Sequence, residues 1–108
     1  MALNQELTKG SSLILILKML EKEPMYGYQM IKIIHEKSNN IFQWKEGSLY
    51  PILFSMEKKE FIKSYWQEGK RRRKYYQITD KGLKEVSKLE KEWILFSDSM
   101  NSLLGGAL

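Results

Sequence analysis

The most chemically distinctive feature of the sequence is a run of five consecutive cations, Lys70, Arg71, Arg72, Arg73 and Lys74. Like charges crowded into so short a run repel one another, so the arrangement is unfavourable unless an anion neutralises it. Phosphate groups along a duplex provide that neutralisation, and the counterions they release supply free energy. A solvated charge run without a partner is the alternative interpretation, but the clustering favours contact with DNA from all five side chains.

A helix predicted from Ser48 to Lys59 presents a second set of polar side chains. Its apolar residues recur at helical spacing and define one face, formed by Leu49, Ile52, Leu53 and Met56. The opposite face carries hydroxyl and ammonium groups, those of Ser48, Tyr50, Ser55, Lys58 and Lys59. Such groups near a helix N-terminus reach base edges or phosphates, so we predict DNA contacts from Ser48, Tyr50 and Lys58. The alternative is an ordinary solvated face with Tyr50 half-buried.

Gly27 stands between two tyrosines at the start of another predicted helix, which runs from Tyr26 to Lys37. A glycine at this position either allows close packing of a neighbouring helix or lets the backbone approach a phosphate, and packing is the favoured interpretation. Tyr26 and Gln29 are expected to reach the DNA backbone, whereas Tyr28 is expected to pack against the protein.

Proline residues mark the boundaries of the elements that position these side chains. A first helix over about residues 11–23 ends before Pro24, because the residue preceding a proline resists helical geometry. A short extended piece is expected over residues 41–44. Pro51 lacks an N–H and fits only the first turn of a helix, so its helix is expected to begin near Ser48.

A β-hairpin and a long helix complete the predicted fold. Residues 61–67 and 72–78 are rich in aromatic and β-branched side chains and flank a glycine-bearing turn, so the hairpin tip holds the five cations. Thr79 is expected to cap a last helix over residues 80–104. Three helices, a hairpin and a long helix make an α+β, mostly α, winged helix-turn-helix, in which the third helix enters a DNA groove and the hairpin flanks it.

The last helix is too long for the partners available in a chain of 108 residues. Its apolar stripe extends past a three-helix core, so a second copy is expected to cover it in a two-fold dimer. We therefore expect a DNA-binding domain over residues 1–79 and a dimerisation helix over residues 80–108. The residues predicted at the dimer interface, or around an effector held there, are Leu7, Ile14, Lys18, Leu89, Trp93, Phe96 and Met100. Trp93 is interpreted first as an interface side chain, and alternatively as a flat wall for a planar effector.

Composition narrows the class of protein. The formal net charge is +5, which is compatible with a polyanionic partner. The chain has no cysteine and a single histidine, His35, which is expected on the solvent side. Glycine-rich phosphate loops and metal-ligand spacings are absent, so we expect no enzyme activity, no cofactor and no metal. The longest apolar run, Leu13 to Leu17, is too short to cross a membrane, and the predicted location is the cytoplasm.

Four short motifs, in this order and spacing, resemble the PadR family of bacterial repressors over residues 7–104. They are MYGY at residues 25–28, EGSLYPIL at 46–53, GKRRRKYY at 69–76 and ITDKG at 78–82. The resemblance implies a homodimeric repressor that binds a double-stranded DNA operator, with the third helix in the major groove. The single C-terminal helix is similar to that of the short subfamily. Some members of this subfamily sense planar hydrophobic drugs in a pore between subunits, beside a tryptophan on the last helix. Trp93 stands where that tryptophan is expected, so a small-molecule effector is an expectation carried by the resemblance.

Three residues depart from the family pattern. Lys18 and Glu90 would face the pore between subunits, where they either pair and close it or select a polar ligand. Many relatives carry glycine where this chain has Glu60, so the turn into the following strand is expected to differ.

Two other functions are compatible with the same fold. An RNA-binding module would need exposed aromatic side chains that stack on splayed bases, and Tyr65, Trp66 and Tyr75 are the candidates, although core packing is the favoured interpretation of these rings. A dimeric interaction protein without nucleic acid is the third hypothesis, and the clustering of cations on the hairpin argues against it.

Overall fold

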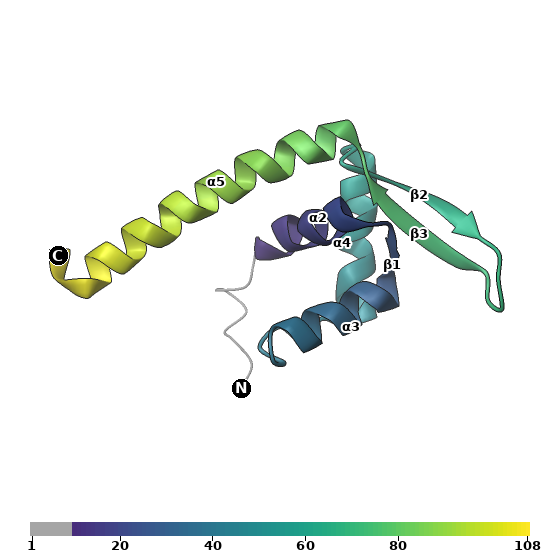
Figure 1. Cartoon of the computed structure of the whole chain (residues 1–108), viewed down its shortest axis with the longest axis horizontal. Coiled ribbons are helices and arrows are strands. Elements are labelled where there is room, and N and C mark those ends of the chain that lie inside the picture. Colours follow the sequence, from purple (N-terminus) through teal and green to yellow (C-terminus); the bar gives the residue numbers. More distant parts are fainter. Residues whose placement is uncertain (1–9) are drawn as a thin grey trace.

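The computed structural model describes residues 10–108, so Leu7 of the predicted interface lies outside the described residues. The elements follow the chain in the order α2 (Ser11–Lys22), β1 (Met25–Tyr26), α3 (Gly27–Lys37), α4 (Glu46–Lys58), β2 (Ile62–Gln67), β3 (Arg73–Ile78), α5 (Asp80–Ser102) and the π-helical turn η1 (Leu103–Ala107). Figure 1 shows α2, α3 and α4 gathered at the base of the sheet, while α5 and the hairpin of β2 and β3 leave in opposite directions. The predicted winged-helix architecture with a long last helix is confirmed.

The hydrophobic core lies between the three short helices and the base of the sheet. Only the first part of α5 reaches it, since Val86 is buried and Leu89 packs partly against the core, whereas Trp93 is 54% exposed. The most completely buried side chains are Ile16, Leu17, Met30, Leu49, Leu53, Ile62 and Val86. The apolar face predicted for the third helix is therefore the face that α4 turns inward.

The sheet has three antiparallel strands in the order β1-β3-β2. The expected hairpin pairs Ile62 with Ile78 at its base and Gln67 with Arg73 near its tip. The sequence reading missed β1, whose two residues pair with Tyr75 and Tyr76 of β3. This short pairing ties the start of α3 to the hairpin. Residues 41–44, predicted to be extended, join α3 to α4 without pairing with the sheet.

The helix α4 begins at Glu46, two residues before the predicted start at Ser48. The Ser48 N–H donates to the Lys45 carbonyl oxygen at 3.0 Å, so the first turn is closed well before Pro51. Pro51 consequently stands in the second turn, where its ring nitrogen offers no donor to the carbonyl of Gly47. The prediction failed because it did not allow this single missing hydrogen bond inside the helix.

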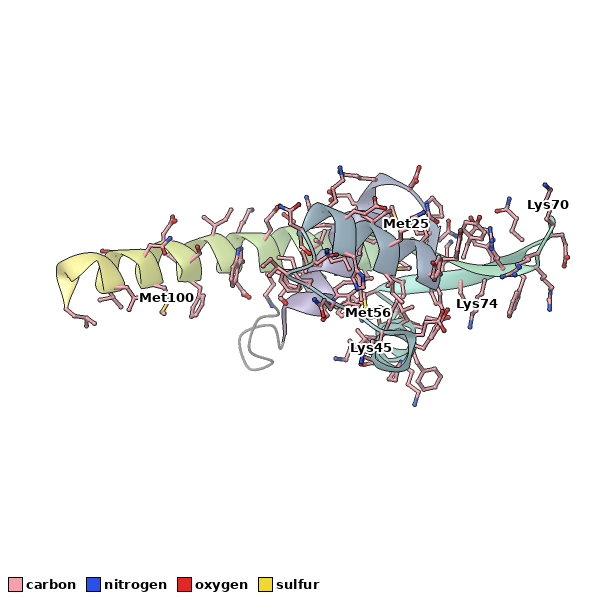
Figure 2. All side chains as sticks on the ribbon, turned by 90° about the horizontal axis from the view of Figure 1, so that it is seen from below. Met25, Lys45, Met56, Lys70, Lys74 and Met100 are labelled. Carbon is pink, nitrogen blue, oxygen red and sulfur yellow. The ribbon has the colours of Figure 1, made fainter. Side chains whose placement is uncertain are left out.

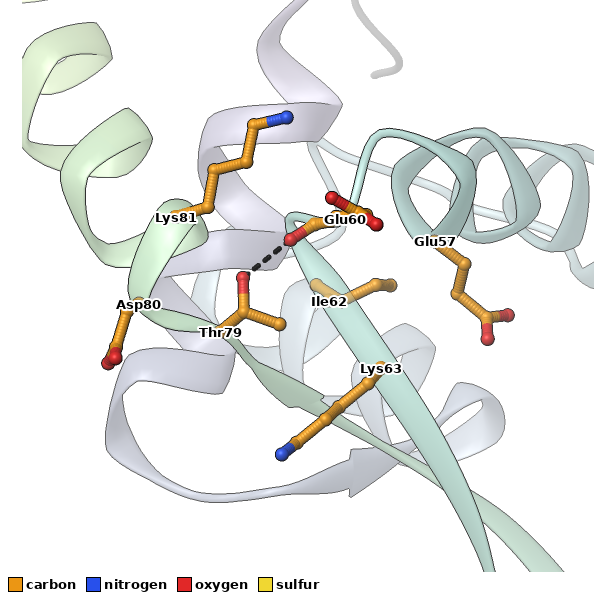
Figure 3. A pocket seen from close by; sticks show the side chains of 7 residues that line it. All are labelled: Glu57, Glu60, Ile62, Lys63, Thr79, Asp80 and Lys81. Carbon is orange, nitrogen blue, oxygen red and sulfur yellow. Dashed lines mark hydrogen bonds between the residues drawn. The ribbon is translucent and has the colours of Figure 1, made fainter.

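A tight turn at Glu60 joins α4 to β2, and the φ angle of Glu60 is 65°, in the left-handed region. The Phe61 N–H donates to the Met56 carbonyl at 3.0 Å and the Glu60 N–H donates to the Glu57 carbonyl at 2.9 Å, which are the paired bonds of a Schellman motif. Figure 3 shows the Thr79 hydroxyl donating to the Glu60 carbonyl oxygen, at 2.6 Å. The turn therefore has the left-handed backbone geometry that glycine favours, although the residue is glutamate.

Replacing Glu60 with glycine is expected to stabilise the fold by about 0.5 to 1 kcal/mol. The left-handed conformation costs an L-residue about 1 to 2 kcal/mol, and glycine removes this cost. Part of the gain is offset, because glycine also gives the unfolded chain more conformational entropy. Urea denaturation would measure the difference. Glu60→Ala is the matched control, because it removes the same carboxylate but keeps the Cβ and so gains nothing. Equal stability of the glycine and alanine variants would contradict the prediction.

Candidate nucleic-acid interface

The hairpin formed by residues 62–78, termed the wing below, distributes its cations over two regions. Lys70 and Arg71 lie in the exposed loop that joins the strands, whereas Arg73 and Lys74 belong to β3 and point to opposite faces of it. Figure 2 shows Lys70 at the far end of the wing and Lys74 closer to its base. The prediction that all five cations sit at the tip is therefore wrong for the last two, because β3 begins at Arg73.

The loop cations differ in how far they are neutralised within the chain. Arg72 pairs with Glu68 at 3.1 Å and stacks over the ring of Trp66, 4.3 Å from its centroid. This ion pair is more than half exposed on both sides, where such pairs contribute little stability and yield readily to a phosphate. Within residues 10–108, neither Lys70 nor Arg71 has an acidic side chain in salt-bridge range.

The face of the wing that carries Arg73 is covered with aromatic rings. The Arg73 guanidinium lies 4.4 Å from the centroid of the Tyr26 ring, and that ring meets Tyr75 edge-on at 5.4 Å. Tyr75 in turn stacks on Tyr65 at 5.7 Å. The Tyr26 N–H also donates to the side-chain oxygen of Gln29, at 3.4 Å. Tyr26 of β1 and Gln29 of α3, both predicted to reach the DNA backbone, thus lie beside the wing.

The expectation that the hairpin aromatics Tyr65, Trp66 and Tyr75 pack in the core is wrong, since none of them belongs to the core cluster. Trp66 is 53% exposed and Tyr65 is 37% exposed, while Tyr75 is half-buried. The two-residue period places Tyr65 and Tyr75 on one side of the wing, where they cover each other rather than the core. Their aromatic character signalled burial, but a projecting hairpin has no core on that side.

Gly27 makes room for Tyr50 of α4. A Cβ atom built on Gly27 would lie 2.7 Å from the Tyr50 hydroxyl oxygen, so the packing interpretation of this glycine is correct. Partial burial, and secondarily the charge of Glu46, raise the pKa of Tyr50, so its hydroxyl keeps the proton it can donate. Tyr28, which was expected to pack, is instead 59% exposed and faces the space between α3 and the wing.

A groove of about 440 Å³ separates α3 and the start of α4 from the wing, and Tyr50 and Lys74 are among its lining side chains. Lys74 approaches Glu57 of α4 at 3.8 Å, and the Ser64 hydroxyl donates to the same carboxylate at 2.8 Å. Burial, followed by the nearby Glu57 charge, raises the pKa of Tyr76 to about 12. These contacts fix the wing relative to α4, so the groove is bordered by cations and by tyrosine hydroxyls that remain protonated.

The outward face of α4 carries the side chains predicted from the sequence. Ser48, Tyr50 and Lys58 are all exposed, on the side away from the buried stripe. Sequence reasoning missed Phe54, which is 60% exposed and lies under the Lys58 ammonium, 4.7 Å from the ring centroid. The signal was available, because an apolar residue falls outside the helical spacing of the inward face.

A second cavity, of about 300 Å³, lies between α2 and α5 beside Trp93. Ile14, Leu89 and Phe96 line it as well, and the rings of Trp93 and Phe96 are 5.9 Å apart. The apolar stripe continues beyond the cavity with Met100, which is 40% exposed. Every described residue of the predicted interface therefore lies either along the apolar stripe of α5 or on α2, the helix that faces it.

Lys18 and Glu90 form an ion pair across α2 and α5, at 3.5 Å. Lys18 also pairs with Glu21 at 2.9 Å, and this hydrogen bond is the main reason why the pKa of Lys18 is raised. Of the two outcomes left open by the sequence, pairing of these charges is the one found within the described chain.

The single histidine, His35, makes a contact that joins two elements of the fold. The His35 ring nitrogen Nε2 lies 3.1 Å from the Trp44 carbonyl oxygen, so this half-buried histidine bridges α3 to the following loop and is not on the solvent side as expected. Among residues 10–108, no group of three or more metal-ligating side chains is found. None of the described helices combines the length and apolar character that crossing a bilayer requires.

Comparisons with known proteins agree on one family. Residues 16–88 match the model of the transcriptional regulator PadR-like family. An uncharacterised protein from Lysinibacillus sphaericus is 34% identical over 105 residues, covering 94% of each chain. Among solved structures, a transcriptional regulator from Clostridium thermocellum has 34% identity and a TM-score of 0.84, covering 90% of this chain and 96% of its own. A PadR-like transcriptional regulator from Bacillus cereus has 32% identity and a TM-score of 0.83, covering 94% of this chain and 98% of its own.

Proposed function

Because the chain belongs to the PadR-like family, whose members are DNA-binding transcriptional regulators and not enzymes, we propose that it is a cytoplasmic repressor that binds a double-stranded operator as a homodimer. The observation that carries this proposal is the pair of loop cations Lys70 and Arg71, exposed and without acidic partners among the described residues. Phosphate oxygens are the anions that such a projecting loop meets on a duplex.

The second support for the proposal is the relation of α4 to the wing. Ser48, Tyr50 and Lys58 occupy the exposed side of α4, and Arg72, Arg73 and Lys74 border the groove beside it. A helix of this kind enters the major groove while the wing follows the adjacent backbone. Base-specific contacts then come from α4, and the wing contributes affinity without regard to sequence.

The homodimer is supported by the exposed stripe of α5. Beyond the reach of the monomer core, large apolar side chains remain exposed on successive turns, including Trp93, Phe96, Met100 and Leu103. Exposed apolar surface of this continuity marks an interface, and a two-fold axis lets one stripe cover its own copy. In this proposal residues 1–79 bind DNA and residues 80–108 join two copies. The cavity beside Trp93 supports a planar effector as a further role of the same interface.

The test is a binding titration of the full chain with the DNA upstream of its own gene, measured against a random-sequence duplex at several salt concentrations. We expect the upstream DNA to bind at least about 1,000-fold more tightly than random duplex. Equal affinity for the two duplexes would refute an operator-specific repressor. Single-stranded RNA serves as competitor, because the exposed Trp66 ring is what an RNA-binding module would use, and preferential binding of the RNA would favour that alternative.

A further inference from the structure

Phe54 is the most exposed large apolar side chain of α4, with 60% of its surface accessible. The inward face of the helix is complete without it, since Leu49, Leu53 and Met56 fill the core. The exposed part of the phenyl ring gains nothing for the fold. The ring is therefore free to contact a partner outside this chain.

The position of Phe54 within α4 gives it neighbours of the kind that contact DNA. It lies four residues after Tyr50 and four before Lys58, so the three side chains share one side of the helix. The Lys58 ammonium rests 4.7 Å from the centre of the phenyl ring. A cation held over one face of the ring can meet a phosphate while the rest of the ring faces the groove floor.

The floor of the major groove offers few partners to an apolar ring. Base edges there present hydrogen-bond donors and acceptors, and the C5-methyl group of thymine is their characteristic apolar feature. A phenyl ring inserted among polar edges would strip water from them without replacing it, whereas a methyl group gains from the same contact. The chemistry of the side chain therefore selects one base among four.

We propose that Phe54 reads a thymine in each operator half-site by packing against its C5-methyl group. This inference rests on the proposed function, because it requires α4 to enter the major groove. It adds a determinant of base identity to a face whose hydroxyl and ammonium groups discriminate poorly between bases. Single exposed apolar residues are common on protein surfaces, and what distinguishes Phe54 is its place between Tyr50 and Lys58 on the exposed side of the proposed recognition helix.

The test removes the methyl group from the DNA and the ring from the protein in turn. Tight-binding sequences are first selected with the full chain from a random-sequence duplex pool, and each thymine is then replaced singly by deoxyuridine, which pairs identically but lacks the methyl group. We expect one position per half-site at which uracil weakens binding about fourfold, the effect of losing one buried methyl group. Phe54→Ala is expected to bind the thymine and uracil duplexes equally, and Phe54→Leu to retain part of the discrimination.

Three results would overturn the inference. The first is tight binding of every uracil duplex by the unmodified chain. The second is an undiminished uracil penalty in Phe54→Ala, which would assign the methyl contact to another residue. The third is failure of the chain to select any sequence from the pool, which would refute the proposed function and with it the role of Phe54.

The folding control is circular dichroism melting. Because the ring is outside the core, Phe54→Ala should be folded as the unmodified chain is.

Discussion

Simultaneous replacement of Arg71, Arg72 and Arg73 by alanine is expected to weaken binding of any duplex by at least on the order of 100-fold at about 0.15 M salt. If each guanidinium neutralises one phosphate, the slope of log affinity against log salt falls in magnitude by about 2.7 per subunit, since each contact contributes about 0.9. The difference between the variant and the unmodified chain should vanish as the salt concentration approaches about 1 M. A fluorescence anisotropy titration at several salt concentrations measures both quantities.

The matched control for the wing variant is Lys84→Ala, Lys88→Ala and Lys91→Ala in one chain. These three lysines are exposed on α5, so the control lowers the net charge by the same amount without touching the wing. We expect it to bind DNA with nearly unchanged affinity and slope. If both triple variants lost the same affinity, binding would depend on total charge rather than on the wing, and the proposed interface would be wrong.

Replacing Phe96 with aspartate is expected to convert the proposed dimer into a monomer. Phe96 is 57% exposed in the single chain and lies on the stripe that a second copy would cover. Burying an unpaired carboxylate costs about 3 kcal/mol or more, so dimerisation should weaken about 100-fold or more. Sedimentation equilibrium over a range of protein concentrations measures the dissociation constant.

DNA binding supplies a second readout for the same variant. A monomer holds one half-site only, so Phe96→Asp should lose most of its affinity for a two-half-site operator while keeping its weak affinity for random duplex. Ser102→Asp is the control, because it adds one carboxylate to an exposed position of the same helix, outside the stripe of Trp93, Phe96 and Met100. A Phe96→Asp chain that stayed dimeric would exclude this stripe as the interface.

The sequence was sufficient for the order of the main elements, because each has strong local signals. Pro24 separates the first two helices, Gly69 marks the turn of the hairpin, and the Thr79 hydroxyl accepts from the Gly82 N–H at 3.0 Å as an N-cap. Pro51 misled the prediction of where α4 begins, because its constraint is a preference that tertiary packing overrides. The strand β1 was not predictable, since its two residues carry no periodicity and pair with residues about fifty positions away.

The candidate site was predictable in its composition but not in its contacts. The wing cations were found from their crowding alone, yet the pairing of Lys74 with Glu57 depends on how α4 packs against β2, the strand paired with β3. Tyr28 and Trp66 were expected to pack because aromatic rings usually do. Trp66 is exposed because it lies on the projecting wing, and Tyr28 is exposed because it lies outside the face that α3 buries. Phe54 was overlooked for a different reason: the outward face was defined by its hydroxyl and ammonium groups, so an apolar residue outside the inward stripe was assigned to neither face.

The pairing of β1 with β3 joins the wing and the N-terminus of α3 into one structural unit, called the head below. Tilting the wing would break the register of Tyr26 with Tyr75 and pull Arg73 away from the Tyr26 ring. In the proposed dimer joined through α5, a signal that releases DNA would act on the distance between the two heads. A change of about 5° where the two α5 helices meet would shift each head by about 3 Å, because α5 is about 35 Å long over its 23 residues.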